Sequence, residues 1–116
     1  MSFDNLSFDK KFELCCNNSL QNHNKLKALG YKLEPEQLPA KSRLFRLSLS
    51  NKYDLSISNP LDLGFPGIET GLCLAASKYD PIFCVYWGYE KQVRTFNTFE
   101  DLTQEIDRLL KLINEQ

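Results

Sequence analysis

The feature that most constrains this chain is the alternation of apolar and polar residues in RLFRLSLSNKYDLSISN, residues 43–59. A period of two predicts two β-strands, each with an apolar side and a polar, solvent-facing side. A two-residue loop between them would turn their apolar sides to opposite faces of the sheet. We therefore expect a hairpin with a three-residue loop, 51–53, in which Leu49 pairs with Leu55.

Three further segments predict the rest of the sheet. The Pro and Gly content of residues 59–71 predicts a loop, and the short apolar run 72–77 predicts a strand after it. The tract 82–87, IFCVYW, is apolar on both faces, which is typical of a central strand or of a strand with one face turned to a partner. Residues 91–96 then predict the return strand of a second hairpin.

The first thirty residues predict a helix that ends at Gly30 in the left-handed conformation. The middle of this segment is rich in Asn and Ser, whose side chains compete for backbone hydrogen bonds. This composition favours a break near Asn17, with Ser19 capping a second short helix. The apolar residues at helical spacing are Phe8, Phe12, Cys15 or Cys16, Leu20, Leu26 and Leu29.

The C-terminal segment predicts an amphipathic helix. Thr98 is an N-cap residue with an acid, Asp101, three positions later. One apolar stripe follows at helical spacing: Phe99, Leu102, Ile106, Leu109 and Ile113. The opposite, solvent-facing side is expected to carry Glu100, Gln104, Glu105, Asp107, Arg108 and Lys111.

Together these segments predict a single α+β domain over residues 1–116. It comprises an N-terminal helical segment, an antiparallel meander sheet of about five strands and a C-terminal amphipathic helix, with the helices on one face of the sheet. A chain of this length buries about two-thirds of its unfolded surface, which supports one ordinary core. The shares of apolar residues (42%) and charged residues (25%) are those of a globular protein.

The sequence also indicates a compartment. The start, MSFDNLSFDKKF, has no apolar run behind a basic end, so we expect no signal peptide. No stretch approaches the roughly 18 apolar residues that a membrane span needs. We expect a cytoplasmic protein with reduced thiols. Its net charge of −1 predicts no strong attraction to nucleic acid or to acidic membranes.

No residue pattern predicts catalysis. His23 is the sole histidine, and only the adjacent Cys15 and Cys16 lie near it in sequence. Adjacent cysteines point in different directions on a helix, and this spacing differs from that of known zinc sites. Cys73 and Cys84 stand in apolar runs, where burial makes a thiol unreactive. We therefore expect no catalytic residue, no metal and no cofactor, and a protein that is not an enzyme.

The aromatic residues of the tract 83–99 allow two interpretations. Aromatic rings between basic residues can stack on nucleic-acid bases. Only Lys91 and Arg94 accompany the rings here, and the neighbouring acids repel phosphate. This disfavours nucleic acid and favours a contact with a protein, for which Tyr and Trp supply rigid area.

The charge distribution points to the same half of the chain. Residues 1–58 hold nine Lys or Arg and six Asp or Glu, whereas residues 59–116 hold five and nine. This difference has two explanations. Either the charges lie on ordinary solvated faces, or the second half carries an acidic surface that meets a basic partner. We expect the partner to contact the 59–71 loop and the hairpin after it, where acids adjoin apolar anchors. The residues expected in this contact are Asp62, Phe65, Ile68, Glu69, Tyr89 and Glu90.

A resemblance supports a binding role. The tract VYWGYEKQVRTFNTFEDLTQEIDRLL, a sheet hairpin leading into an amphipathic helix, is similar in style to the small immunity proteins of bacterial toxin systems, including contact-dependent inhibition. The resemblance implies stoichiometric binding that neutralises a cognate toxin, often a nuclease with a basic active-site surface. Because these families share no diagnostic motif, the resemblance assigns no function to any individual residue. A secretion chaperone for an effector and a phage-encoded inhibitor of host defence are the alternatives, and the oligomeric state stays open.

Overall fold

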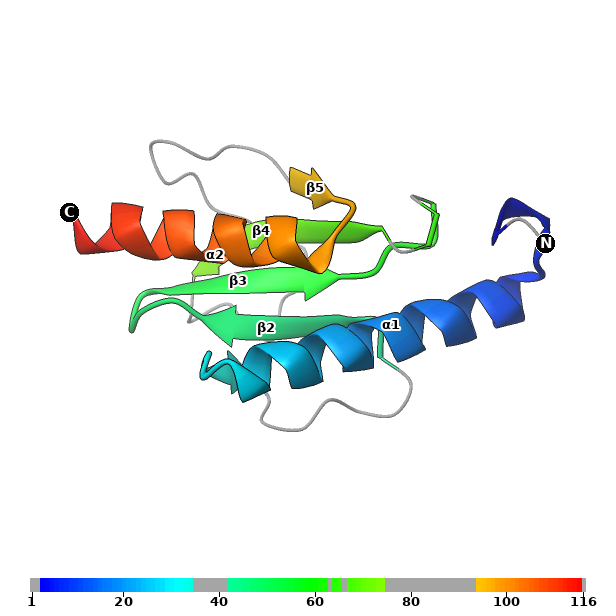
Figure 1. Cartoon of the computed structure of the whole chain (residues 1–116), viewed down its shortest axis with the longest axis horizontal. Coiled ribbons are helices and arrows are strands. Elements are labelled where there is room, and N and C mark those ends of the chain that lie inside the picture. Colours follow the sequence, from blue (N-terminus) through cyan, green and yellow to red (C-terminus); the bar gives the residue numbers. More distant parts are fainter. Residues whose placement is uncertain (1–2, 35–41, 63, 66, 75–93, 116) are drawn as a thin grey trace.

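A computed structural model describes the chain over residues 3–34, 42–62, 64–65, 67–74 and 94–115, without the side chains of residues 73 and 74. In these residues five strands form one antiparallel sheet, in the order β1-β2-β3-β4-β5 (Figure 1). The strands are β1 (Leu33–Glu34), β2 (Leu44–Ser48), β3 (Tyr53–Ser58), β4 (Ile68–Leu74) and β5 (Arg94–Phe96).

Two α-helices, α1 (Phe8–Ala28) and α2 (Phe99–Asn114), lie across the same face of this sheet, and a short 3₁₀ turn, η1 (Phe3–Asn5), precedes α1 (Figure 1). The core between the layers joins both helices to the central strands, with residues such as Leu26 of α1, Phe45 of β2 and Ile106 of α2. The predicted α+β architecture is therefore confirmed, including its meander sheet and its two helical ends.

The β2–β3 hairpin has the predicted apolar face but a different register. Leu47, not Leu49, pairs with Leu55. The backbone N–H of Leu49 donates to the Tyr53 carbonyl at 3.0 Å, so the three residues between them form the loop. The odd loop length is thus correct and its position, 51–53, is wrong. Because a shift of two residues keeps every side chain on its face, alternation alone does not distinguish the two registers.

Local chemistry explains the register that forms. The Ser50 hydroxyl oxygen accepts hydrogen bonds from the backbone N–H groups of Lys52 and Tyr53, at 3.1 and 3.2 Å. Such side-chain-to-backbone bonds favour a turn that starts at the serine. The same register moves Tyr53 from the loop into β3, where its ring joins the buried core.

The start of β4 is another difference from the prediction. Residues 59–71 were expected to form a loop, whereas β4 begins at Ile68 and pairs there with Phe96 of β5. Ile68, Thr70 and Leu72 are buried on the face that carries the core. The Pro and Gly residues of this segment predicted a loop, and the alternation of Ile68, Thr70 and Leu72 was therefore missed. The expected strand 82–87 lies outside the described residues.

The N-terminal helix is continuous, so the predicted break near Asn17 is wrong. The polar residues of its middle turns face inward: Asn18, Ser19, Asn22 and His23 are all buried. The Ser19 hydroxyl donates to the Arg43 carbonyl at 2.7 Å, just before β2. Tertiary contacts of this kind override the weak helix propensity of Asn and Ser.

The end of α1 has the predicted glycine cap. Gly30 adopts a φ of 96°. Its N–H donates to the Lys27 carbonyl and the Tyr31 N–H donates to the Leu26 carbonyl, at 3.0 and 3.2 Å. This pair of bonds is a Schellman motif, which satisfies the last carbonyl groups of the helix. At the other end, the Ser7 hydroxyl accepts from the Lys10 N–H as an N-cap.

The polar face of the hairpin is less exposed than its pattern predicts. Arg46 and Asp54 point to the face opposite the core, because they alternate with core residues along β2 and β3. Both are buried, and the register places them as diagonal neighbours on adjacent strands. Opposite charges at such positions stabilise strand pairing.

The C-terminal helix has the predicted stripe. The Thr98 hydroxyl accepts from the Asp101 N–H at 3.1 Å, which confirms the N-cap. Leu102, Ile106 and Leu109 are fully buried, while Phe99 and Ile113 are half-buried against the same core. This helix docks through aliphatic side chains, in contrast to the polar docking face of α1.

We expect Ile106→Ala to lower the free energy of unfolding by about 2–4 kcal/mol, because it leaves a cavity beneath α2. Urea denaturation followed by circular dichroism measures this change. Leu29→Ala is the matched control, because Leu29 is 62% exposed at the end of α1. The control should change the free energy by less than about 0.5 kcal/mol. Equal effects of the two substitutions would contradict the placement of the stripe.

A hydrogen bond joins the two helices at one point. The Tyr31 hydroxyl, just after α1, donates to Asp107 of α2 at 2.8 Å. Burial, the hydrogen bond to Asp107 and the negative charge of Asp107 raise the pKa of Tyr31 from 10.0 to about 12. Since the folded-state pKa exceeds the unfolded value, this stabilisation is complete below pH 10 and is lost as the pH rises toward 12.

We expect the stability difference between the parent and Tyr31→Phe to narrow between pH 9 and pH 12, because the parent alone loses this hydrogen bond on ionisation. Urea denaturation of both proteins at several pH values measures the difference directly. Other groups titrate equally in both proteins and cancel in the comparison. A difference that stays constant with pH would contradict the contribution of the Tyr31–Asp107 bond.

Candidate functional site

The loop between β3 and β4 carries two of the predicted partner-binding residues on the surface. Asp62 is exposed, and Phe65 is 44% exposed, which is unusual for a large aromatic side chain. The loop therefore presents an acid and an aromatic ring together, as predicted. Whether they bind a partner stays a prediction.

The other predicted residues are placed differently. Ile68 was expected as an exposed anchor, but it is 2% exposed because it begins β4 and packs in the core. Glu69, the next residue of β4, is half-buried. Tyr89 and Glu90 lie outside the described residues. The structure thus retains the loop part of the expected surface and moves Ile68 into the interior.

Three aromatic residues of the N-terminal segment join Phe65 at one end of the molecule. The rings of Phe3 and Phe65 stack with centroids 6.3 Å apart and planes 19° apart. On the first turns of α1, the rings of Phe8 and Phe12 stack with centroids 6.3 Å apart and planes 15° apart. We call Phe3, Phe8, Phe12 and Phe65 the aromatic end.

Backbone and side-chain contacts hold the aromatic end in place. The Cys15 thiol contacts the Pro60 carbonyl at 3.7 Å, so the loop lies against α1. Within the loop, the buried Asn59 side-chain amide donates to the Gly67 carbonyl. The Gly67 N–H donates in turn to the Gly64 carbonyl at 2.9 Å. Gly64 has a φ of 79°, which a residue with a side chain rarely adopts.

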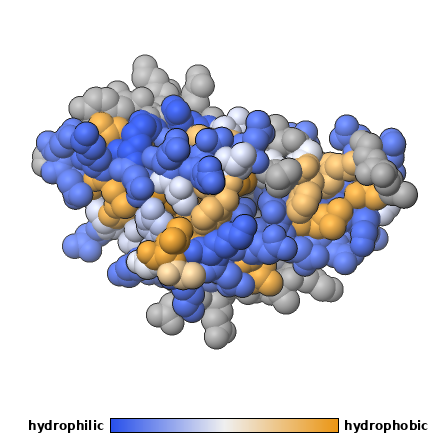
Figure 2. Space-filling view, in the orientation of Figure 1, coloured by the Kyte–Doolittle hydropathy of each residue, from blue (hydrophilic) through white to orange (hydrophobic). Residues whose placement is uncertain are grey.

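The aromatic end is accessible to a partner. Phe8 is 66% exposed. Figure 2 shows hydrophobic surface gathered over the start of α1 and the neighbouring loop, bordered by hydrophilic residues. Exposed apolar area with a polar border is typical of contact surfaces. The aromatic end is therefore the stronger candidate site of the described residues.

A second candidate lies at one edge of the sheet, between the last strand, β5, and α2. The Glu105 carboxylate accepts from Nε of Arg94 at 2.8 Å and from Nε of Arg108 at 2.6 Å. The Glu105 side chain is 3% exposed, so the expectation that it faces solvent is wrong. Buried carboxylates require such partners, because an unpaired charge in the interior is strongly unfavourable.

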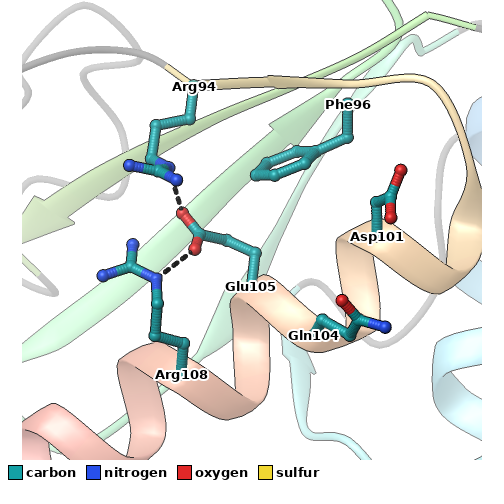
Figure 3. Close-up of a pocket in the computed structure, with 6 residues that line it drawn as sticks. All are labelled: Arg94, Phe96, Asp101, Gln104, Glu105 and Arg108. Atoms are coloured by element: carbon teal, nitrogen blue, oxygen red, sulfur yellow. Dashed lines mark hydrogen bonds and ion pairs between the residues drawn. The ribbon is translucent and has the colours of Figure 1, made fainter.

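The ion-pair cluster of Glu105, Arg94 and Arg108 adjoins a hollow of about 220 Å³. Figure 3 shows the two arginines converging on Glu105 from β5 and α2, with the Phe96 ring across the hollow. Gln104 and Asp101 line its other side. Both oxygens of the carboxylate are engaged, so the geometry ties β5 to α2.

The thiols and the imidazole of α1 are placed in the interior. Burial raises the pKa of the Cys15 and Cys16 thiols, and the positive charge of Arg43 offsets part of this shift. A raised pKa disfavours the nucleophilic thiolate. The His23 ring packs edge-on against Phe45 with centroids 5.3 Å apart. Among the described residues, no group of three or more potential ligands could hold a metal ion.

No protein-family model matches the sequence, and comparison with the curated proteins and with the solved structures gave no match. Neither α1 nor α2 has both the length and the apolar character needed to cross a membrane.

Sequence reasoning found the loop half of the aromatic end and missed its N-terminal half. Phe8 was assigned to the apolar stripe of α1, because helical spacing does not tell which turns of a helix lie over the sheet. A signal was present in FDNLSFDKKF, where Phe3 precedes the Ser7 cap and each aromatic residue adjoins a charged one. Glu105 was likewise misplaced: it stands three residues after Leu102 and four before Leu109, so helical spacing puts it on the buried side of α2.

We expect Glu105→Ala to lower the free energy of unfolding by about 1–3 kcal/mol, because it removes two charge-assisted hydrogen bonds between β5 and α2. Chemical denaturation measures the change. Gln104→Ala is the control: it alters an exposed neighbour in the same hollow and should change stability by less than about 0.5 kcal/mol. If the two variants are equally stable, the ion-pair cluster contributes nothing measurable.

Proposed function

We propose that this chain is a non-enzymatic binding protein that neutralises a cognate toxin by stoichiometric binding, as an immunity protein does. The observation that carries the proposal is the aromatic end, where Phe8 and Phe65 are 66% and 44% exposed. Large exposed aromatic side chains are unfavourable for an isolated domain and are enriched at protein interfaces. A role in the cytoplasm, with a protein partner, belongs to the same proposal.

The geometry of the aromatic end suits a specific contact. Its rings are held by stacking and by the Cys15–Pro60 contact, so little conformational entropy is lost when a partner binds. Anchors of this kind supply most of the binding energy of an interface, while the surrounding polar residues exclude water. Asp62 is an exposed acid of the same loop, three residues before Phe65.

The similarity of the C-terminal tract to immunity proteins supports the choice of a toxin as the partner. In the described part of that tract, β5 leads directly into the amphipathic helix α2. The proposed toxin has a basic surface, for example a nuclease active site, because acids of the second half would steer it toward this chain. Stoichiometric masking requires only a complementary surface, which agrees with a role that needs no catalytic group.

The proposal is tested by recovering partners of the tagged full-length chain from its native cells and assaying the purified partner for toxic activity. We expect one equivalent of the chain to abolish this activity. Phe65→Ala should weaken inhibition at least tenfold if the ring is a binding hot spot. Leu29→Ala, which trims an exposed apolar side chain at the far end of α1, should leave inhibition unchanged.

The charge contribution is tested in the same assay. We expect Asp62→Lys to slow association about two- to tenfold at low salt and less at high salt, because exposed charges act mainly on the encounter rate. Glu115→Lys is a matched reversal at the exposed C-cap of α2 and should have little effect. Loss of inhibition by Glu115→Lys alone would move the interface to α2. A partner without toxic activity would refute the immunity role.

A further inference from the structure

We propose that the aromatic end binds arginine side chains of the protein partner, with one guanidinium stacked on the exposed ring of Phe8 or another on that of Phe65, and each paired with a nearby acid. This inference rests on the proposed function and specifies the chemistry by which the partner is recognised. It also extends the contact from the 59–71 loop to the start of α1, which sequence reasoning did not include.

The rings of the aromatic end are accessible to a cation. Phe8 and Phe65 each stack on a second phenylalanine and still leave 66% and 44% of their surface exposed. The faces of aromatic rings carry partial negative charge, which attracts a cation within about 6 Å of the centroid. A planar guanidinium also stacks on such a ring, which an ammonium group does not do.

The aromatic end already holds one positive side chain of the protein itself. Nζ of Lys11 lies 5.6 Å from the centroid of the Phe3 ring, which itself stacks on Phe65. The aromatic end therefore accommodates a positive side chain from its own helix in the geometry of a cation–π contact. The proposed contact places the partner's cations on the neighbouring rings in the same manner.

The residues around the rings carry more negative than positive charge. The segment from residue 3 to 13 and the loop residue Asp62 together contain four acids and two lysines. Lys10 pairs with Glu13 at 3.6 Å, and Lys11 covers Phe3. Asp9 directly follows Phe8, and Asp62 belongs to the loop that carries Phe65; both acids are exposed. The surface thus combines aromatic faces with a surplus of negative charge, which complements arginine and repels phosphate groups.

The experiment is a titration of the ¹⁵N-labelled full-length protein with the peptide acetyl-GRGRGRG-amide, followed by NMR. We expect amide shifts confined to residues 3–13 and 61–65. An identical peptide with citrulline in place of arginine is the control, because citrulline keeps the shape and loses the charge. The citrulline peptide should produce much smaller shifts.

Variants separate the cation–π contact from a general apolar contact. Phe8→Leu and Phe65→Leu keep an apolar side chain and remove the ring, and each should weaken peptide binding about two- to fivefold. Asp62→Asn should weaken it by a similar factor and reduce its salt dependence. Leu29→Ala should bind as the parent does. Circular dichroism should show unchanged helix content in all four variants, because the altered side chains are exposed.

Three results would overturn the inference: equal shifts with the citrulline peptide, shifts centred on α2, or no shifts at about 10 mM peptide, which bounds the affinity below useful strength. These results leave the proposed function separately testable. If Phe8→Leu inhibits the recovered toxin as well as the parent does, arginine recognition at this ring is wrong and the immunity role stands. If no toxin is recovered but the arginine peptide binds as expected, the immunity role fails and the surface chemistry stands.

Discussion

The rest of the structure depends on the burial of one apolar face of the β2–β3–β4 sheet beneath α1 and α2. Leu47, Leu55 and Ile57 supply this face, and Leu26 of α1 and Ile106 of α2 help to close it. Burying a large aliphatic side chain contributes roughly 1.5–3 kcal/mol, so a contiguous set of them outweighs any single polar contact in this fold. The positions of the loop, of β5 and of α1 follow from the sheet that this burial fixes.

The two helices dock on that sheet by different physical means. On α2 the buried side chains are almost all aliphatic, and Glu105 adds ion pairs to β5. On α1 the buried face is mostly polar, and the side-chain amide nitrogen of Asn18 has no hydrogen-bond partner among the described residues. A buried donor without a partner lowers stability, so the polar face of α1 stabilises the fold less than an aliphatic face of the same area would. The bond between Tyr31 and Asp107 partly compensates by connecting the end of α1 to α2.

This difference also explains what the sequence could predict. Repetitive apolar patterns identified α2 and the β2–β3 hairpin, since each pattern fixes which side of its element is buried. The polar face of α1 depends on contacts between distant segments, such as that of Ser19 with the Arg43 carbonyl, and the hairpin register depends on the hydrogen bonds of Ser50. Periodicity carries no information on such contacts. For the candidate site, composition indicated Asp62 and Phe65, while the stacking of Phe3 on Phe65 needed the fold.

The length of α1 has a mechanical consequence. Its first buried residues are Cys15 and Cys16, and Figure 1 shows its N-terminal turns extending past the ends of the strands. At 1.5 Å per residue, the helix from Phe8 to Cys15 extends about 10 Å beyond its first buried residue. From Cys15 to Leu26 the same helix is anchored in the interior, with the Cys15 thiol against the Pro60 carbonyl and the His23 ring against Phe45. Because the helix is uninterrupted, this anchored part fixes the direction in which the protruding turns present their side chains.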